Sequence, residues 1–368
     1  MFMSKTNKKK GKKALVVLLC FVLVMAIGCG GLVAYWHSIK NAVPEVEDTL
    51  TYDFDGDETV AVSLQDAPDF EQIFEGDAAE LKAAIKDWAT NGGDLMYSED
   101  VINILCIGVD TRNKNTVSGL TDSMIIVSVN KALGTITFTS VMRDSYAYLE
   151  SPDGTGSFNK INSAFPFYGI DNLINTLESH FKIRIDGYAM VNFALFKAVI
   201  DKLGGVNVEL SEYEAQYFNK NHGWDLKAGS SVNLNGDQAL VFCRSRKIYN
   251  DGDVQRTQNQ REVLIALLQK AATIKASEIP EYVKTFLPYF ETSYNEAKLI
   301  LLGSDAVRGG WARFSVNQIV MPDENCRKAH SGDVWYWEVD YPLAAQTLQL
   351  AIYGETNITL SENRTAFY

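Results

Sequence analysis

The chain has 368 residues, of which 46% are hydrophobic and 11% aromatic, and its formal net charge is −12. This composition excludes a wholly disordered chain, and the length suffices for one large or two smaller domains. The acidic balance argues against a nucleic-acid binder that depends on a basic surface, so no nucleic-acid partner is expected.

The N-terminal segment predicts a membrane anchor. Residues 1–13 form a basic tail with six lysines and no acidic residue, and residues 14–36 carry no charge over 23 positions. As a helix, 23 residues extend about 35 Å, which is enough to cross a bilayer. The lysines before this span predict a cytoplasmic N-terminus, so the rest of the chain is expected outside the membrane.

Two alternatives to an uncleaved anchor are a cleavable signal peptide and a lipoprotein signal. A signal peptide has a shorter apolar core than this segment. Ala26-Ile27-Gly28-Cys29 loosely matches an acylated-cysteine site, but Gly30 to Tyr35 stay apolar instead of turning hydrophilic. We therefore interpret 14–36 as a single transmembrane helix. With either an uncleaved anchor or a lipoprotein signal, the functional part of the chain is exocytoplasmic and tethered to the membrane.

Acidic residues dominate the stretch after the predicted anchor. Residues 37–97 hold fifteen Asp and Glu against three lysines. Most of this stretch has little periodicity and is expected to be an exocytoplasmic linker or accessory segment. Helical spacing begins only at 78–89, and that predicted helix ends at Asn91-Gly92-Gly93.

From residue 98 onward, the pattern predicts strands and helices in alternation. Short apolar runs bounded by turn residues predict strands at 102–109, 123–129, 135–141, 187–191 and 206–210, and the apolar run 239–243 is interpreted in the same way. Helical spacing predicts helices at 171–181, 193–203 and 254–273. The expected fold class is therefore α/β, with a mixed central sheet flanked by helices, behind one N-terminal transmembrane helix.

The cysteines and histidines form no recognisable metal or disulfide pattern. The five cysteines lie at 20, 29, 106, 243 and 326, without a CxxC pair. Cys106 and Cys243 lie in apolar runs and are interpreted as buried thiols, and whether they pair is left open. The four histidines show neither metal spacing nor a partner for a nucleophile, so histidine chemistry is not expected.

Charged residues stand at the ends of the first three predicted strands, where α/β folds place their sites. Asp110 and Arg112 follow the strand 102–109. Asp122 opens the second strand, and Arg143 and Asp144 close the third. Taken singly, an Arg–Asp pair is usually a solvated ion pair, and Asp144 has the alternative role of holding Arg143.

A second group of polar residues surrounds the start of the long predicted helix. Arg244 and Arg246 follow the run 239–243, and residues two apart in an extended chain face the same side. Asp253 lies at the helix start, where it is a candidate cap. Arg256 and Gln260 are one helical turn apart, on a face that continues into apolar residues.

The two groups together indicate a ligand of high negative charge. Arginine forks match phosphate oxygens in bidentate geometry, and aspartates hold Mg²⁺ that bridges a pyrophosphate. The sequence therefore predicts a pyrophosphate site on the exocytoplasmic part of the chain.

These residues lie in an ordered series of motifs that resembles the LytR-CpsA-Psr family. The motifs are Gly108-Val109-Asp110-Thr111-Arg112, Thr121-Asp122-Ser123-Met124, Ser140-Val141-Met142-Arg143-Asp144, Lys160-Ile161-Asn162-Ser163-Ala164, Val191-Asn192-Phe193, Gly204-Gly205-Val206, Asn235-Gly236-Asp237-Gln238-Ala239-Leu240, Cys243-Arg244-Ser245-Arg246, Asp253-Val254-Gln255-Arg256 and Gln260-Arg261. They run through residues 98–270, with a looser tail beyond. So many motifs in order make the resemblance specific.

The resemblance implies an exocytoplasmic, Mg²⁺-dependent (or Mn²⁺-dependent) phosphotransferase. The family moves anionic glycopolymers, such as wall teichoic acid or capsule, from a polyprenyl-pyrophosphate carrier to peptidoglycan. It also implies a catalytic domain over 98–275 and a C-terminal α/β extension over 276–368 that packs on it. The prenyl tail is expected in an apolar groove among the helices.

Carried over to matching positions, the family's site residues fall on the two polar groups. Asp110 and Asp122 are expected to bind the metal. The pyrophosphate headgroup is expected to contact Arg112, Arg143, Arg244, Arg246, Arg256 and Gln260. Asp110, Asp122, Arg143, Arg244 and Arg246 are the expected catalytic residues.

The sequence departs from the family pattern at three positions and leaves two other functions open. Met142 stands where the family usually has Pro, Asn259 replaces a common Arg, and Cys243 replaces a common Ala. The alternatives are a non-catalytic polyprenyl-pyrophosphate-binding sensor and a lipid pyrophosphatase. Thirteen cytoplasmic residues are too few for a DNA-binding domain.

Overall fold

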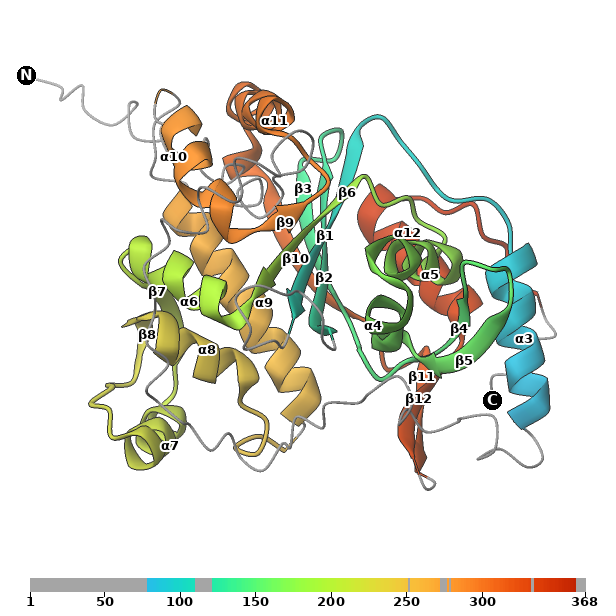
Figure 1. The fold of residues 1–368 in the computed structure, drawn as a ribbon, viewed down its shortest axis with the longest axis horizontal. Coiled ribbons are helices and arrows are strands. Elements are labelled where there is room, and N and C mark those ends of the chain that lie inside the picture. Colours follow the sequence, from blue (N-terminus) through green and yellow to red (C-terminus); the bar gives the residue numbers. More distant parts are fainter. Residues whose placement is uncertain are drawn as a thin grey trace, which may run out of the picture. The chain divides into compact units, whose positions relative to one another are not determined.

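The computed structural model describes residues 78–109, 121–250, 252–271, 277, 279–331 and 334–361 (Figure 1). These residues form two compact units. The inserted unit comprises Gly187–Ser315, and the flanking unit comprises 78–186 together with 316–361. The division falls at 186/187 and 315/316, whereas the sequence predicts limits at 97/98 and 275/276. The predicted catalytic domain and extension stay a prediction.

The predicted N-terminal elements lie outside the described residues. This holds for the basic tail 1–13, the anchor 14–36 and the acidic stretch up to 77. In the part of the chain that the structure describes, none of the helices combines the length and the apolar character that a membrane span requires. The transmembrane helix therefore stays a prediction.

The flanking unit is built on antiparallel strands that follow one another in sequence. They are β1 (Val101–Val109), β2 (Thr121–Asn130) and β3 (Thr135–Val141), with β10 (Ser315–Met321, of which only Ser315 belongs to the inserted unit) beyond β3. Most side chains of β1, β2 and β3 are buried. This burial agrees with their nearly continuous apolar sequence.

Two helices pack together in the flanking unit, one of them against β2 of the sheet (Figure 1). They are α5 (Ile170–Phe181) and α12 (Tyr341–Tyr353). The rings of His180 and Tyr341 lie 4.4 Å apart, and the amide of Gln349 donates to the Lys182 carbonyl at 2.8 Å. The helix α3 (Ala78–Asn91), predicted over 78–89, joins them because Trp88 Nε1 donates to the His180 carbonyl at 2.8 Å.

Two hairpins complete the flanking unit. The first is β4 (Tyr146–Glu150) with β5 (Gly156–Lys160), followed by the short helices η2 (Ile161–Ser163) and α4 (Ala164–Tyr168). The second is β11 (Arg327–Ser331) with β12 (Trp335–Val339). The backbone N–H of Trp337 donates to the Asp144 carbonyl at 2.9 Å, so the second hairpin is attached next to the start of the first.

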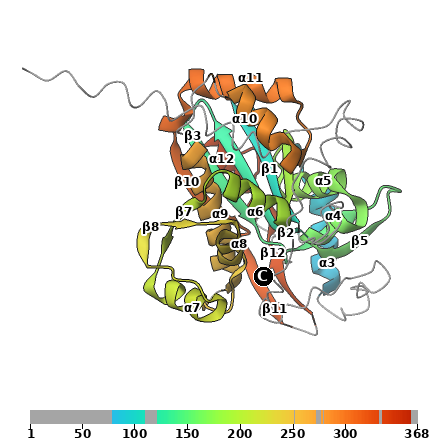
Figure 2. The same ribbon diagram turned by 60° about the vertical axis from the view of Figure 1, so that its left-hand side comes forward.

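The inserted unit alternates helices with short strands. Strand β6 (Gly187–Asn192) pairs with β9 (Glu291–Thr292) and leads into α6 (Phe193–Lys202), whose first turn is capped by the Asn192 side chain. Strands β7 (Val206–Leu210) and β8 (Gly229–Leu234) form an antiparallel pair, and α7 (Glu212–His222) lies between them in sequence (Figure 2). The helices α8 (Gly236–Arg244) and α9 (Gly252–Ala271) follow and pack together.

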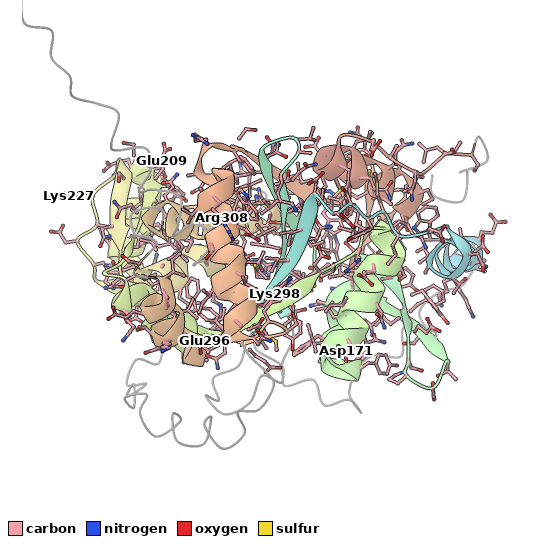
Figure 3. The ribbon with its side chains drawn as sticks, turned by 90° about the horizontal axis from the view of Figure 1, so that it is seen from above. Asp171, Glu209, Lys227, Glu296, Lys298 and Arg308 are labelled. Atoms are coloured by element: carbon pink, nitrogen blue, oxygen red, sulfur yellow. The ribbon has the colours of Figure 1, made fainter. Side chains whose placement is uncertain are left out.

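The inserted unit ends with two further helices, α10 (Ile279–Phe286) and α11 (Glu296–Gly309), and the short helices η4 (Leu287–Tyr289) and η5 (Trp311–Arg313). On α11, Leu299, Leu302 and Ala306 are buried. Glu296 and Lys298 lie near one end and Arg308 near the other (Figure 3). This is the pattern of an amphipathic surface helix.

One predicted element is wrong. The run 239–243 is the centre of α8 and not a strand. The Asn235 side chain accepts the Gln238 N–H at 2.9 Å, and the Gln238 side chain accepts the Asn235 N–H at 3.0 Å, which caps the helix start. Five apolar residues alone do not distinguish a strand from a buried helical turn.

Candidate functional site

Arg143 and Asp122 meet because β2 and β3 are antiparallel. In that pair Ile125 lies opposite Ser140. The same register brings Asp122, near the start of β2, opposite Arg143, directly after β3. Two polar residues far apart in sequence are therefore placed side by side by strand pairing alone. This confirms that the structure brings together these two predicted site residues.

Arg143 is held between two carboxylates in the flanking unit. Its Nη1 lies 2.5 Å from Asp122 Oδ1, and its Nε lies 3.4 Å from Asp144 Oδ2. Lys160 Nζ lies 2.6 Å from the other oxygen of Asp144. We call Asp122, Arg143, Asp144 and Lys160 the Arg143 cluster. All four side chains are at least three-quarters buried, so they interact in a medium less screening than bulk water.

The backbone around this cluster is also fixed. The Asn162 N–H donates to the Arg143 carbonyl at 3.3 Å, and the Thr121 hydroxyl donates to the Asn162 carbonyl at 3.3 Å. Val109, the last residue of β1, pairs with Thr121. The predicted site residues Asp110 and Arg112 follow Val109 in sequence but lie outside the described residues.

Lys160 is a member that sequence reasoning missed as a site residue. It lies in a motif that carried the family resemblance, which was the available signal, but its pairing with Asp144 depends on the β4–β5 hairpin. The structural role considered for Asp144 is confirmed, because this carboxylate contacts both Arg143 and Lys160.

The inserted unit holds the second predicted group at the junction of α8 and α9. Arg246 lies two residues beyond α8, where the chain passes close to the start of α9. A Cβ on Gly252 would lie 2.5 Å from the Arg246 carbonyl oxygen, so only glycine permits this approach. The first turn of α9 is thereby placed next to Arg246.

Asp253 brings two of the predicted arginines together. Its Oδ1 lies 2.7 Å from Arg256 Nη2 and 3.4 Å from Arg246 Nη2. We call Arg246, Asp253 and Arg256 the Arg256 cluster. The Arg256 side chain is only 5% exposed, which confirms its predicted inward orientation.

Arg244 has a different neighbour from the one predicted. The expectation that Arg244 and Arg246 share one side of an extended chain is wrong, because Arg244 is the last residue of a helix. Its guanidinium lies over the ring of Phe193 instead, 4.5 Å from the centroid. A cation over an aromatic face is stabilised by the ring quadrupole.

Gln260 and Asn259 join α9 to the end of α8. Gln260 Nε2 donates to the Cys243 carbonyl at 3.4 Å. Asn259 Nδ2 donates to the Phe242 carbonyl at 3.0 Å and to the Tyr249 hydroxyl at 2.9 Å. Asn259 is 1% exposed, so the amide that replaces the family's common arginine makes buried structural contacts.

The apolar face of α9 is already filled. Leu264 and Leu267 are buried against the protein. Burial also lowers the pKa of Arg261 to about 10, and Arg261 is the arginine next to Gln260 in the family-like motif. The stripe that continues from Arg256 is therefore protein core along the described part of this helix.

The three described cysteines are free thiols in buried positions. Burial raises the pKa of Cys106 to about 12 and that of Cys326 to about 12, and it raises the pKa of Cys243 further. A thiol needs its thiolate form to act as a nucleophile, so these side chains are inert at neutral pH.

The residues around Asp122 have the donor chemistry that Mg²⁺ prefers. Among the described residues there is no group of three or more His, Cys, Asp or Glu side chains placed to hold a metal ion. Asp122 is the one described member of the predicted pair. The buried Asn162 Oδ1 has no hydrogen-bond partner among the residues that the structure describes, and the Asn162 backbone bonds to Thr121 and Arg143. Carboxylate and amide oxygens of this kind fit a hard divalent cation.

Comparison with known proteins adds a family and a fold. The model of the LytR_cpsA_psr family matches residues 72–351. The chain is 26% identical over 275 residues to the polyisoprenyl-teichoic acid–peptidoglycan teichoic acid transferase TagU of Bacillus subtilis (strain 168). That match covers 74% of this chain and 75% of the relative.

Solved structures share the fold at low identity. The crystal structure of B. subtilis TagV has a TM-score of 0.55 and 23% identity, over 71% of this chain and 100% of the other. A LytR-CPS2A-psr family protein, YwtF (TagT), was solved with a bound octaprenyl pyrophosphate lipid. Its TM-score is 0.52 with 21% identity, over 70% of this chain and 93% of the other. The predicted α/β class, with a mixed sheet flanked by helices, is thereby confirmed.

Proposed function

Because the chain belongs to the LytR-CpsA-Psr family, we propose that it is a membrane-anchored glycopolymer transferase acting outside the cytoplasmic membrane. It moves an anionic polymer of teichoic acid or capsular type from a polyprenyl-pyrophosphate carrier to peptidoglycan. Support comes from the TagU relative, whose name states this reaction class for teichoic acid, and from the neighbour with a bound polyprenyl pyrophosphate. Arg143, fixed between two carboxylates where β2 begins and β3 ends, is the observation that carries the proposal.

Arg143 would stabilise the negative charge that develops at the transferred phosphate. The acceptor hydroxyl attacks the sugar-linked phosphorus, and the bond to the carrier's phosphate breaks, so polyprenyl phosphate leaves. Asp122 and Asp144 hold the guanidinium in one orientation before the substrate arrives, and this preorganisation lowers the barrier. Lys160 and Arg143 each contact one oxygen of the Asp144 carboxylate, so both oxygens are engaged in ion pairs, which makes Asp144 a poor candidate for a general base.

A divalent cation belongs to the same proposal. Mg²⁺ would be held by Asp110 and Asp122, as the resemblance implies, and it would supply charge neutralisation at the pyrophosphate when bound. The donor chemistry around Asp122 supports this assignment, together with the orphaned Asn162 Oδ1.

The inserted unit supplies the remaining proposed contacts to the carrier. Arg244, Arg246, Arg256 and Gln260 are the proposed pyrophosphate ligands of this unit. Phe193 lies under Arg244, and Leu195 and Phe196, further along α6, are half-buried. An apolar surface that begins at an arginine suits a lipid whose headgroup is anionic. The filled stripe on α9 makes α6 the better place for the prenyl chain.

The test is transfer from a synthetic lipid-linked donor to a peptidoglycan oligomer with purified protein. Arg143→Ala should lower the turnover rate on the order of 100-fold, because one charge-stabilising donor is lost. Arg184→Ala is the matched control, since Arg184 lies 3.3 Å from Asp186 in an ion pair of the same unit but outside the Arg143 cluster. The control should retain wild-type turnover.

The same assay without acceptor separates the alternatives. A transferase releases little polyprenyl phosphate when no peptidoglycan is present, whereas a lipid pyrophosphatase releases it at an undiminished rate. A non-catalytic sensor binds the donor but catalyses neither transfer to peptidoglycan nor hydrolysis of the donor. Undiminished transfer by both Arg143→Ala and Asp122→Ala would overturn the site assignment.

A further inference from the structure

The β11–β12 hairpin presents tryptophan side chains on its outer face. In its register, Ala329 lies opposite Trp337 and Ser331 opposite Trp335. Side chains alternate along a strand, so Trp335, Trp337 and Ala329 share one face and Tyr336 points to the other. Trp335 is 38% exposed and Ala329 is exposed as well. Trp335 and Ala329 are therefore exposed on this face, whereas Trp337 is half-buried and Val339, further along the same face, is buried.

The opposite face attaches the hairpin to the flanking unit. Tyr336 is 1% exposed, and its ring centroid lies 4.7 Å from that of Tyr146 and 4.5 Å from that of His330. A two-stranded sheet that docks through one face normally carries polar residues on the other. The hairpin docks through Tyr336, whereas Trp335 on the other face is 38% exposed, so burial in the core does not account for an indole at position 335.

The tryptophan rings are held in a fixed corner. Their centroids lie 4.9 Å apart with 74° between the ring planes. The guanidinium of Arg327 lies 4.6 Å from the Trp337 ring and fixes it further. The buried indole N–H of Trp337 has no acceptor among the described residues. Internal hydrogen bonding therefore does not require an indole at this position.

The corner is continuous with the Arg143 cluster within the flanking unit. The Trp337 N–H donates to the Asp144 carbonyl at 2.9 Å. Arg327 Nη1 donates to Met142 Sδ at 2.8 Å and to the Pro322 carbonyl at 3.0 Å. The hairpin thus contacts the residues on both sides of Arg143. A substrate group bound at the corner would lie next to the residue assigned to the transferred phosphate.

We propose that Trp335 and Trp337 form a carbohydrate subsite that stacks against a pyranose ring of the peptidoglycan acceptor. A pyranose ring has an apolar face of C–H groups, whose partial positive charge is attracted to the negative face of an aromatic ring. Its hydroxyl rim requires hydrogen-bond donors, and Arg327 supplies one at the edge of the corner. The assignment to the acceptor rests on the proposed transferase function.

Glycan binding is tested by saturation-transfer NMR with chitotetraose, a soluble oligomer of an amino sugar, and the full chain. Trp335→Ala should weaken binding by about tenfold or more, since an exposed aromatic anchor is lost. Trp335→Phe, which keeps an aromatic face, should restore most of the affinity. Tyr97→Ala is the matched control, because Tyr97 is an exposed ring of the same unit with Arg184 over it at 4.4 Å. It should leave chitotetraose binding unchanged.

Farnesyl pyrophosphate binding, measured on the same variants, separates this proposal from the transferase proposal. It should be equal in wild type, Trp335→Ala and Tyr97→Ala, while transfer by Trp335→Ala shows a raised KM for the peptidoglycan oligomer. Wild-type protein that binds chitotetraose but fails in transfer contradicts the transferase and leaves the glycan subsite standing. The subsite is overturned if Trp335→Ala binds chitotetraose like wild type. It is also overturned if the wild-type protein binds phosphatidylglycerol vesicles, loses this binding in Trp335→Ala, and binds no chitotetraose.

Discussion

Substitutions of Arg256 can distinguish a structural role of this side chain from a role in ligand binding. Its Nη2 lies 2.7 Å from Asp253 Oδ1 and its side chain is 5% exposed, against 11% for Asp253. Arg256→Ala leaves a nearly buried carboxylate whose other ion-pair partner among the described residues, Arg246, lies 3.4 Å away. Breaking a buried pair costs about 3–5 kcal/mol in general. Because Arg246 compensates in part, we expect a loss of about 2–3 kcal/mol in the free energy of unfolding.

Arg256→Lys keeps the charge but not the planar fork. It should lower the free energy of unfolding by about 1–2 kcal/mol and should weaken farnesyl pyrophosphate binding by about 1–3 kcal/mol. Farnesol, which lacks the headgroup, should bind equally to wild type and variant. Arg308→Lys is the matched control, because Arg308 also lies 2.7 Å from an aspartate three residues earlier. That pair is 70% and 58% exposed, so its change should be below about 1 kcal/mol.

A double-mutant cycle isolates the pair. Urea unfolding of Asp253→Ala, Arg256→Ala and the double variant should give a coupling energy of about 1–3 kcal/mol, since the two side chains are in direct contact. A coupling energy below about 0.5 kcal/mol would refute the reasoning from burial. If Arg256→Lys weakens farnesol and farnesyl pyrophosphate to the same degree, Arg256 is not a pyrophosphate ligand.

Three further predictions concern stability and reactivity. Burial lowers the pKa of His180 to about 4, so the unfolded state takes up a proton first as pH falls below about 6.5. Between pH 7 and 4.5, wild type should therefore lose about 2–3 kcal/mol more of its unfolding free energy than His180→Gln, and equal losses would contradict this. Asn259→Ala should cost about 1–3 kcal/mol in urea unfolding, because the Phe242 carbonyl and the Tyr249 hydroxyl lose a buried donor. Peptide mapping after iodoacetamide treatment at pH 8 should find Cys106 unmodified in the native protein and modified in urea, and labelling of the native protein would show that the thiol is accessible.

Local sequence signals determined much of the fold. The apolar runs that became β1 and β3 are buried at most positions, so their type followed from composition. The start of α9 was predictable because apolar residues recur at helical spacing beyond it. The error at 239–243 arose from giving more weight to five apolar residues than to the cap before them. Asn235 and Gln238 form that capping box, and it was visible in the sequence.

The identity of the candidate site residues was easier to predict from the sequence than the contacts that these residues make. Arg143 and Asp122 stood at strand ends, and antiparallel pairing brought them together. Arg327 carried no such signal, because its contact with Met142 spans 185 positions of the chain. Contacts of that range depend on how elements pack, and a pattern within one element does not encode them.

Two residues that depart from the family pattern, Asn259 and Met142, make internal contacts next to the arginines of the proposed site. Asn259 is satisfied by two acceptors on neighbouring segments, so a cation at this position would have had to displace a packed amide. Met142 is fully buried and accepts a hydrogen bond from Arg327, beside the residue whose charge matters most for the proposed chemistry. Both substitutions stand next to site residues and both make internal contacts. The residues that support the arginines therefore vary, while Arg143, Arg246 and Arg256 keep carboxylate partners that orient them. Orientation is what preorganised charge stabilisation requires.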